Sequence, residues 1–271
     1  MNFAIFINTH GRVNNQKTYE TLRRCGYTGK IYLVIDNEDN SDYSSYGHFV
    51  FDKQSYMKLT DSGTNHPRKN VQLYARNACE DFAKQLKLDS FVMCDDDISQ
   101  FRFRIVESEK LKSYNITKNF DKIIEAYNEY LLDANISAIS TGMPQMYFSG
   151  ANINETLHKW RVPYQFTFRN TKFKVNWLSE YGEEYVTAIA NQNQFMMCVP
   201  IIQHTTPGLG GGKNGMHEMY EQENFRLAQY GYIWNPNCNE IILYKDKFMC
   251  QIKRDKAFPK LVSSKYQLQP N

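Results

Sequence analysis

The sequence predicts an α/β protein with a central, mostly parallel sheet flanked by helices. Short apolar runs alternate with helical stripes along the first hundred residues, which is typical of strands joined by crossover helices. One apolar run ends in three consecutive aspartates, where α/β sheets commonly bind ligands. At 271 residues the chain can bury a sizeable core as one domain.

The first hundred residues set up this alternation. Apolar runs at 3–8, 30–35 and 90–94 predict strands buried on both faces. A shorter strand is expected around 48–51, within a polar stretch at 40–70 that otherwise predicts a loop. Helices are expected at 18–25, where Gly26 follows, and at 71–86, where apolar residues recur at helical spacing.

The rest of the chain continues the pattern with less regularity. A helix is expected at 120–132, and strands are expected at 136–141, 166–175 and 194–199. Residues 205–215 are rich in glycine, which predicts a loop, and a helix at 218–230 should end at Gly231. No internal repeat or interdomain linker stands out.

Composition narrows the functional classes. The net charge of +3 is too close to neutral to indicate nucleic-acid binding by itself. The six cysteines form no C-x-x-C pair, which predicts reduced, buried thiols and a cytoplasmic protein. No apolar run reaches the roughly 18 residues of a membrane span, and the N-terminus lacks a signal-peptide pattern. We therefore expect neither secretion nor a membrane anchor, and no protein partner is evident.

The three consecutive aspartates are Asp95, Asp96 and Asp97. Like charges this close raise one another's pKa unless a cation or hydrogen-bond donors compensate them. Oxygen ligands alone favour Mg²⁺ or Mn²⁺, which usually bridge to substrate phosphates. A solvated acidic turn is the alternative. The apolar run that leads directly into the triplet favours the metal site.

Residues 91–98 resemble the DxD motif of GT-A glycosyltransferases, and residues 3–12 resemble their first strand and donor loop. The resemblance implies a single GT-A, Rossmann-like domain over 1–271, with a nucleotide-sugar half at 1–100 and an acceptor half at 101–271. It also implies a UDP-sugar donor and Mn²⁺ or Mg²⁺ held by Asp97 and Asp95, with Asp95 also on the ribose side. The remaining donor-binding residues in the first half would be Thr9, Arg12, Asp36, Arg76 and Asp96.

The family also carries an acidic motif near the start of a late helix, which supplies the base in inverting enzymes. Its counterpart here is the segment 220–227, in which Glu221 and Glu223 compete for this role and Gln222 departs from the usual Glu-Asp pair. His217 and Glu218 are further candidates. In the glycine-rich segment 207–215, Lys213 could contact donor phosphate, or the segment could be a plain surface loop.

The sequence motifs say less about the acceptor than about the donor. The chain resembles phage enzymes that glycosylate hydroxymethylated pyrimidines in DNA, the group related to TET-associated glycosyltransferases, which would act in the host cytoplasm. Such an acceptor would suit a surface of basic and aromatic residues; the alternative is that these side chains only solvate strands. The candidates are Arg102, Arg104, Lys110, Lys112, Lys118, Lys159, Trp160, Arg161, Tyr164, Phe166, Phe168, Arg169, Lys172, Phe173 and Lys174.

The alternatives are a glycan or lipopolysaccharide acceptor, a nucleotidyltransferase, and a non-catalytic binding module. A nucleotidyltransferase would usually show a glycine-rich nucleotide loop after the first strand, and the segment 8–12 has one glycine. The sugar cannot be read from these residues.

Overall fold

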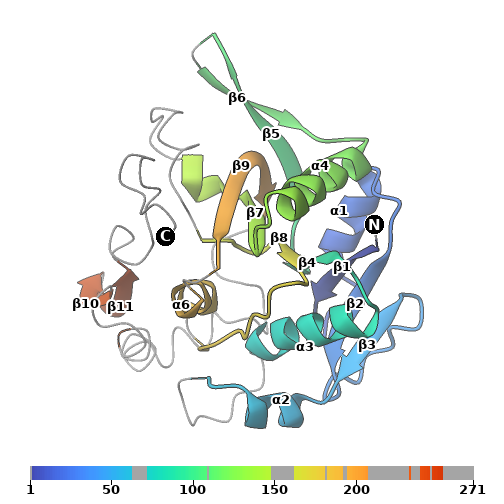
Figure 1. The fold of residues 1–271 in the computed structure, drawn as a ribbon, viewed down its shortest axis with the longest axis vertical. Helices are drawn as coiled ribbons and strands as arrows, with labels where there is room; N and C mark the ends of the chain where they lie inside the picture. Colours follow the sequence, from blue (N-terminus) through green and yellow to red (C-terminus); the bar gives the residue numbers. More distant parts are fainter. Residues whose placement is uncertain are drawn as a thin grey trace, which may run out of the picture.

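A computed structural model describes residues 2–62, 72–108, 110–147, 162–180, 182–191, 194–206, 232, 239–244 and 246–252. Its main feature is a nine-stranded sheet with the strand order β3-β2-β1-β4-β8-β7-β9-β5-β6 (Figure 1). A separate antiparallel pair is formed by β10 (Asn239–Tyr244) and β11 (Lys247–Ile252). The expected α/β class, with a central sheet between helices, is confirmed.

The N-terminal part of the sheet is parallel. It consists of β1 (Phe3–Asn8), β2 (Ile31–Asp36), β3 (His48–Phe51) and β4 (Ser90–Asp95). Strand β1 pairs in parallel with both β2 and β4, and β2 pairs in parallel with β3. The carboxyl ends of these strands therefore lie at one edge of the sheet, which is the edge that carries the aspartate triplet.

Beyond β4 the sheet is mixed. The remaining strands are β5 (Gln100–Glu107), β6 (Lys110–Asn115), β7 (Ala138–Gly142), β8 (Thr167–Asn170) and β9 (Met196–Thr205). Strand β8 is antiparallel to both β4 and β7, β7 is parallel to β9, and β5 is antiparallel to β9 and β6. The expected parallel pairing thus applies to residues 3–95, and the later strands insert in both directions.

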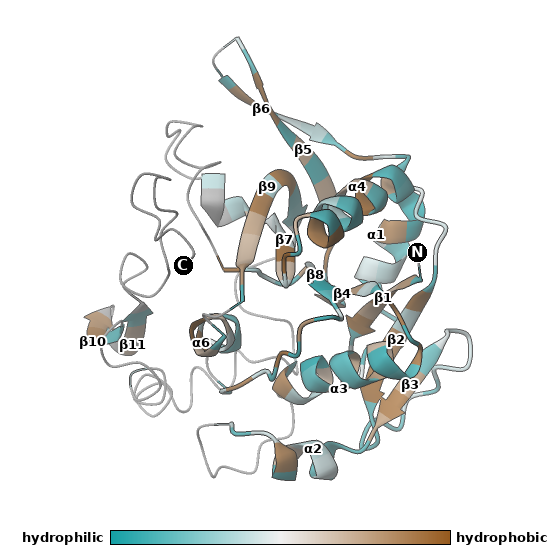
Figure 2. Cartoon of the chain, in the orientation of Figure 1, coloured by the Kyte–Doolittle hydropathy of each residue, from teal (hydrophilic) through white to brown (hydrophobic). Residues whose placement is uncertain are grey.

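Helices cover both faces of the sheet. They are α1 (Lys17–Arg24), α2 (Lys53–Leu59), α3 (Gln72–Gln85), α4 (Phe120–Asp133) and α6 (Glu183–Ala190), with a 3₁₀ turn η1 (Pro144–Tyr147). Successive residues of β1 alternate between the faces: Phe6 packs with residues of α3, and Ile5 packs with residues of α1 and α4. Figure 2 shows apolar colouring along much of β2 and β9, and helices of mixed character. Two buried clusters, one on each face, hold the layers together.

Most expected elements of the first 142 residues are present within one to two residues of their expected ends. Helices α2 and α6 and the β5–β6 hairpin were not expected, and β8 is shorter than the strand expected at 166–175. The five described cysteines are buried thiols that form no disulfide, as expected. Within the described part of the chain, no helix has both the length and the apolar character needed to cross a bilayer. The helix expected at 218–230 lies outside the described residues.

Candidate active site

The aspartate triplet lies at the carboxyl end of β4, a strand whose six residues are all buried. Asp95 is the last residue of this strand and lies opposite Asn8, the last residue of β1. Asp95 is 7% exposed and Asp96 is 5% exposed, so neither side chain is a solvated turn residue. Buried carboxylates require a compensating charge or hydrogen-bond donors.

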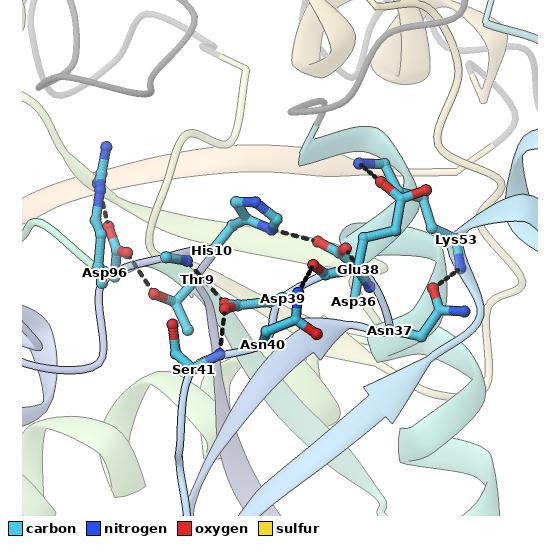
Figure 3. A network of polar contacts seen from close by, with 12 residues as sticks. Thr9, His10, Asp36, Asn37, Glu38, Asp39, Asn40, Ser41, Lys53 and Asp96 are labelled. Carbon is cyan, nitrogen blue, oxygen red and sulfur yellow. Dashed lines mark hydrogen bonds and ion pairs between the residues drawn. The ribbon is translucent and has the colours of Figure 1, made fainter.

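The β1–α1 loop supplies Asp96 with both a compensating positive charge and hydrogen-bond donors. Its Oδ2 accepts a hydrogen bond of 2.6 Å from Thr9 Oγ1, and its Oδ1 accepts one of 2.6 Å from Arg12 Nη1. Gln16 Nε2 donates in turn to Thr9 Oγ1 at 2.9 Å. Figure 3 shows the Thr9–Asp96 contact at one end of the polar network. The structure thus brings together Thr9, Arg12 and Asp96, three of the expected donor-binding residues.

Asp95 and Asp97, unlike Asp96, each have a carboxylate oxygen without a hydrogen-bond donor among the described residues. The Oδ1 atom of each is buried and accepts no hydrogen bond from the described residues. Burial raises the pKa of Asp95 to about 7, and the charge of Asp97 adds to this shift, although Arg76 opposes it. Burial also raises the pKa of Asp97, with the charge of Asp96 acting in the same direction. Both side chains therefore present oxygen atoms that a cation would stabilise.

Arg76, in the middle of α3, is the cation nearest to Asp95. Its Nη2 atom is 4.0 Å from Asp95 Oδ1, 3.1 Å from Glu184 Oε1 and 3.2 Å from Glu183 Oε1. Its guanidinium carbon lies 4.8 Å from the centroid of the Trp177 ring, and its side chain is only 3% exposed. One guanidinium thus lies near three carboxylates. When all three are ionised, the cluster of Arg76, Asp95, Glu183 and Glu184 carries an excess of negative charge.

Glu183 and Glu184 begin helix α6. The helix follows Gly182, which adopts the left-handed conformation at φ +59°, and the two glutamates occupy its first turn. The partial positive charge of a helix N-terminus stabilises carboxylates there. Even so, burial raises the pKa of Glu183 to about 8, with a further contribution from Glu184. This glutamate pair therefore contains a carboxyl group that changes its charge near neutral pH.

The sequence analysis did not identify Glu183 and Glu184. An acidic pair directly after a glycine and before an apolar helical segment was the available signal, because it marks a helix start. The acidic motif that supplies the base in the family was predicted at Glu221 and Glu223. These two residues lie outside the described residues, as do Lys213, His217 and Glu218.

The fit of the triplet to a metal ion follows from these contacts. Among the described residues, no group of three or more His, Cys, Asp or Glu side chains is arranged to hold a metal by itself. Asp95 and Asp97 offer two buried oxygen atoms that accept no hydrogen bond there. Mg²⁺ and Mn²⁺ are often bound by one or two carboxylates together with substrate phosphates and water. The residues present fit that type of site.

A second polar network lies beyond the end of β2 (Figure 3). His10 Nδ1 is 2.6 Å from Asp36 Oδ2, and Asp39 Oδ2 accepts hydrogen bonds from the Gly11 amide at 2.7 Å and from the Tyr43 hydroxyl at 2.8 Å. The hydrogen bond with Asp36 raises the pKa of His10. Burial acts to raise the pKa of Asp36, but His10 reverses this and the net shift is downward. Asp36 is therefore an ionised carboxylate beside the donor loop.

The structure contradicts part of the expected basic and aromatic surface. Arg169 is fully buried in β8 and binds Glu80 Oε1 through Nε at 2.8 Å. Phe166 and Phe168 are fully buried in the core. These residues are inaccessible because β8 is an inner strand between β4 and β7.

Lys172 and Lys174 are exposed, but they lie away from the triplet. They follow Asn170, which pairs with Ser90 at the start of β4, whereas Asp95 ends that strand. Lys159, Trp160 and Arg161 lie outside the described residues. Of the expected surface, Arg102, Arg104, Lys110 and Lys112 remain together, on the β5–β6 hairpin.

Comparisons with known proteins agree with a sugar-transferring enzyme. The family model described as TET-Associated Glycosyltransferase matches residues 3–201. No curated protein sequence matches the chain significantly. The match favours glycosyl transfer over the nucleotidyltransferase and the non-catalytic module.

Solved structures with a similar fold share little sequence with the chain. Glucosyl-3-phosphoglycerate synthase from Mycobacterium tuberculosis, in complex with Mn²⁺, UDP and phosphoglyceric acid, has a TM-score of 0.48 and 7% identity, over 93% of this chain and 86% of that one. A mannosyltransferase from Pyrobaculum calidifontis, in complex with GDP-Man and Mn²⁺, has a TM-score of 0.49 and 12% identity, over 86% of this chain and 63% of that one.

Proposed function

The chain belongs to the TET-associated glycosyltransferase family and is a glycosyltransferase, and on this premise we propose that it transfers a sugar from a UDP-sugar to a hydroxyl group with the help of Mn²⁺ or Mg²⁺. The observation that carries the proposal is the division of the triplet. Asp96 is fully compensated by Thr9 and Arg12, while Asp95 and Asp97 retain buried oxygens without hydrogen-bond donors among the described residues.

In this mechanism Asp95 and Asp97 would hold the metal, and Asp96 stabilises the loop that follows β1. The metal, when bound, neutralises charge that develops on the departing nucleoside diphosphate. The Asp96 contacts fix Thr9 and Arg12 in the loop that follows β1, where the donor diphosphate would bind. Asp36, kept ionised by His10, can accept a hydrogen bond from a uracil N–H.

An inverting transfer requires a base for the acceptor hydroxyl. The hydroxyl oxygen bonds to the sugar carbon, the bond from that carbon to the diphosphate breaks, and the hydroxyl proton passes to a carboxylate. The Glu183–Glu184 pair suits this role because it lies beside Asp95 through Arg76 and has a carboxyl group with a pKa of about 8, close to the operating pH of most enzymes. We place this pair ahead of Glu221 and Glu223.

The acceptor that we propose is the 5-hydroxymethyl group of a pyrimidine in DNA, such as that of a phage. The group is a primary alcohol, and the family carries the TET association in its description. A base in duplex DNA would have to leave the stack to reach a buried carboxylate. A glycan or lipopolysaccharide hydroxyl is the competing acceptor.

The test is to offer hydroxymethylated and unmodified duplexes of one sequence, and a glycan in a parallel reaction, with a panel of labelled nucleotide sugars and Mn²⁺. We expect label on the hydroxymethylated duplex, with a UDP-sugar as donor. The unmodified duplex controls for transfer to other DNA hydroxyls. Label on a glycan and on neither duplex would overturn the DNA acceptor and leave sugar transfer in place.

A further inference from the structure

The β5–β6 hairpin leaves the sheet as a two-stranded ribbon. Only residues 100–103 of β5 pair with β9, whereas β5 and β6 pair with each other from Arg102↔Asn115 to Glu107↔Lys110. Beyond Phe103 the hairpin therefore has no third strand, and Figure 1 shows it projecting from the body of the molecule. Because β6 is the last strand of the sheet, the ribbon is open to a partner on that side.

One face of the ribbon combines apolar side chains with two lysines, Lys110 and Lys112, and one carboxylate, Glu107, which lies opposite Lys110. Directly opposed residues share a face, which places Phe103 with Tyr114 and Ile105 with Lys112. Phe103, Ile105 and Tyr114 are 36%, 38% and 45% exposed. Ile105 lies in the part of the ribbon without a third strand, whereas Phe103 also pairs with Ile202 of β9 and the Tyr114 hydroxyl donates to Glu107 Oε2 at 2.7 Å. Three partly exposed large apolar side chains on one face have a cost in water, which indicates a surface that is covered by a partner.

The basic residues of the ribbon differ in the contacts that their side chains make with the rest of the protein. Arg104 donates from Nε to Gln203 Oε1 at 2.5 Å, and its guanidinium lies over the ring of Tyr147 at 4.4 Å. Arg102 donates from Nε to Gln100 Oε1 at 2.7 Å. Lys110 and Lys112 form no ion pair with the described residues and are exposed towards the tip. Residues 100–115 hold four basic and two acidic side chains, a balance of +2.

The root of the ribbon is fixed close to the triplet. Gln100 follows Asp97 by three residues, and the Ser99 amide donates to Thr205 O at 2.8 Å. The eight residues from Gln100 to Glu107 span roughly 25 Å, the length of about seven base pairs. A partner that contacts the ribbon face and the active site at once must therefore be long, and the positive balance of the ribbon favours an anionic one.

We propose that the β5–β6 ribbon docks in a groove of duplex DNA, several base pairs from the pyrimidine that the active site modifies. The major groove admits a two-stranded β-ribbon. Lys110 and Lys112 bind phosphates, and the apolar side chains of Phe103, Ile105 and Tyr114 lie against sugars and base edges. The choice of DNA rests on the proposed function, while the ribbon's shape and charge are independent of it.

The experiment measures binding of the full chain to a labelled, unmodified 25-base-pair duplex over a series of salt concentrations. The variant Lys110→Ala/Lys112→Ala should bind more weakly, and the slope of log affinity against log salt should decrease by about 2. Ile105→Ala should weaken binding without changing this slope. The matched control is Lys172→Ala/Lys174→Ala, which removes two exposed lysines at the opposite end of β4 and should keep both affinity and slope.

Melting temperature provides the folding check, because all five positions are at least a third exposed or lie outside the core. Wild-type affinity and slope in the Lys110→Ala/Lys112→Ala variant would overturn the ribbon proposal, as would failure of the wild-type chain to bind the duplex. Ribbon-dependent duplex binding without transfer to hydroxymethylated DNA would overturn the proposed acceptor while supporting the ribbon as a DNA contact. Sugar transfer to hydroxymethylated DNA, with duplex affinity unchanged in the Lys110→Ala/Lys112→Ala variant, would support the proposed acceptor and overturn the ribbon as a DNA contact.

Discussion

The two sides of the aspartate triplet show how neighbouring residues with one chemistry acquire different roles. Asp96 receives Thr9 and Arg12 from the donor loop, each at 2.6 Å. Asp95 receives no hydrogen bond on Oδ1 from the described residues, and its nearest cation, Arg76, is shared with Glu183 and Glu184. The side with matched charges stabilises the loop that follows β1, and in the proposed function the side with excess negative charge is the one that binds the metal ion.

The largest expected effect comes from the glutamate pair on the uncompensated side. If it supplies the base, Glu183→Gln or Glu184→Gln should lower kcat by roughly 10²–10⁴-fold while leaving UDP affinity nearly unchanged. The same measurements on Glu221→Gln and Glu223→Gln serve as the comparison. Full activity in both variants of the pair, with a loss in Glu221→Gln or Glu223→Gln, would return the role to the later segment.

Stability should separate the two sides by the sign of the change. Asp96→Asn turns one acceptor oxygen into a donor that faces Thr9 or Arg12, and should lower the free energy of unfolding by about 1–3 kcal/mol. Asp95→Asn removes a poorly compensated charge and should keep or raise stability at pH 8 without metal. Both are measured by denaturant unfolding. A clear loss of stability in Asp95→Asn would show that its charge is compensated after all.

The dependence of stability on pH tests the same contrast more finely. The pKa of Asp95 is raised from 3.8 to about 7, and that of Glu183 is raised from 4.5 to about 8. A carboxyl group whose pKa is raised by folding contributes stability that is complete below its unfolded pKa and is lost as the pH rises through its folded pKa. Metal-free protein should therefore lose this contribution between about pH 4 and 8.

The measurement is melting temperature against pH in chelator, for the wild type and for Asp95→Asn. The difference between the two should favour the wild type more at low pH than at high pH. Mn²⁺ should shift the wild-type profile, because a cation favours the ionised carboxylate. A constant difference in melting temperature between the wild type and Asp95→Asn at all pH values would contradict the raised pKa of Asp95.

The sequence was sufficient for features that depend on local pattern. Apolar runs predicted β1, β2 and β4, and the apolar run before the triplet argued correctly against a solvated acidic turn, because Asp95 and Asp96 are buried. Contacts between distant segments could not be predicted in this way. Whether an arginine in a strand is exposed depends on a partner such as Glu80, which lies 89 residues from Arg169. The reading of Arg169 as a surface residue was therefore wrong.

The glutamate pair was missed for a related reason. Its role depends on Arg76, which is 108 positions away from Glu184 in the sequence, and no local pattern connects the two. The hairpin was a different case. The alternation of Phe101, Arg102, Phe103 and Arg104 has the period of a strand, but only the two arginines were interpreted, as part of a basic surface.

The claim that Asp95 and Asp97 hold the donor's metal is tested most directly by UDP affinity with and without Mn²⁺. Calorimetry would compare the wild type with Asp95→Ala and Asp97→Ala, after melting temperature has shown that both variants are folded. Mn²⁺ is expected to strengthen UDP binding to the wild type, and each variant should lose this dependence on the metal. Metal-dependent UDP binding of wild-type strength in both variants would contradict the assignment.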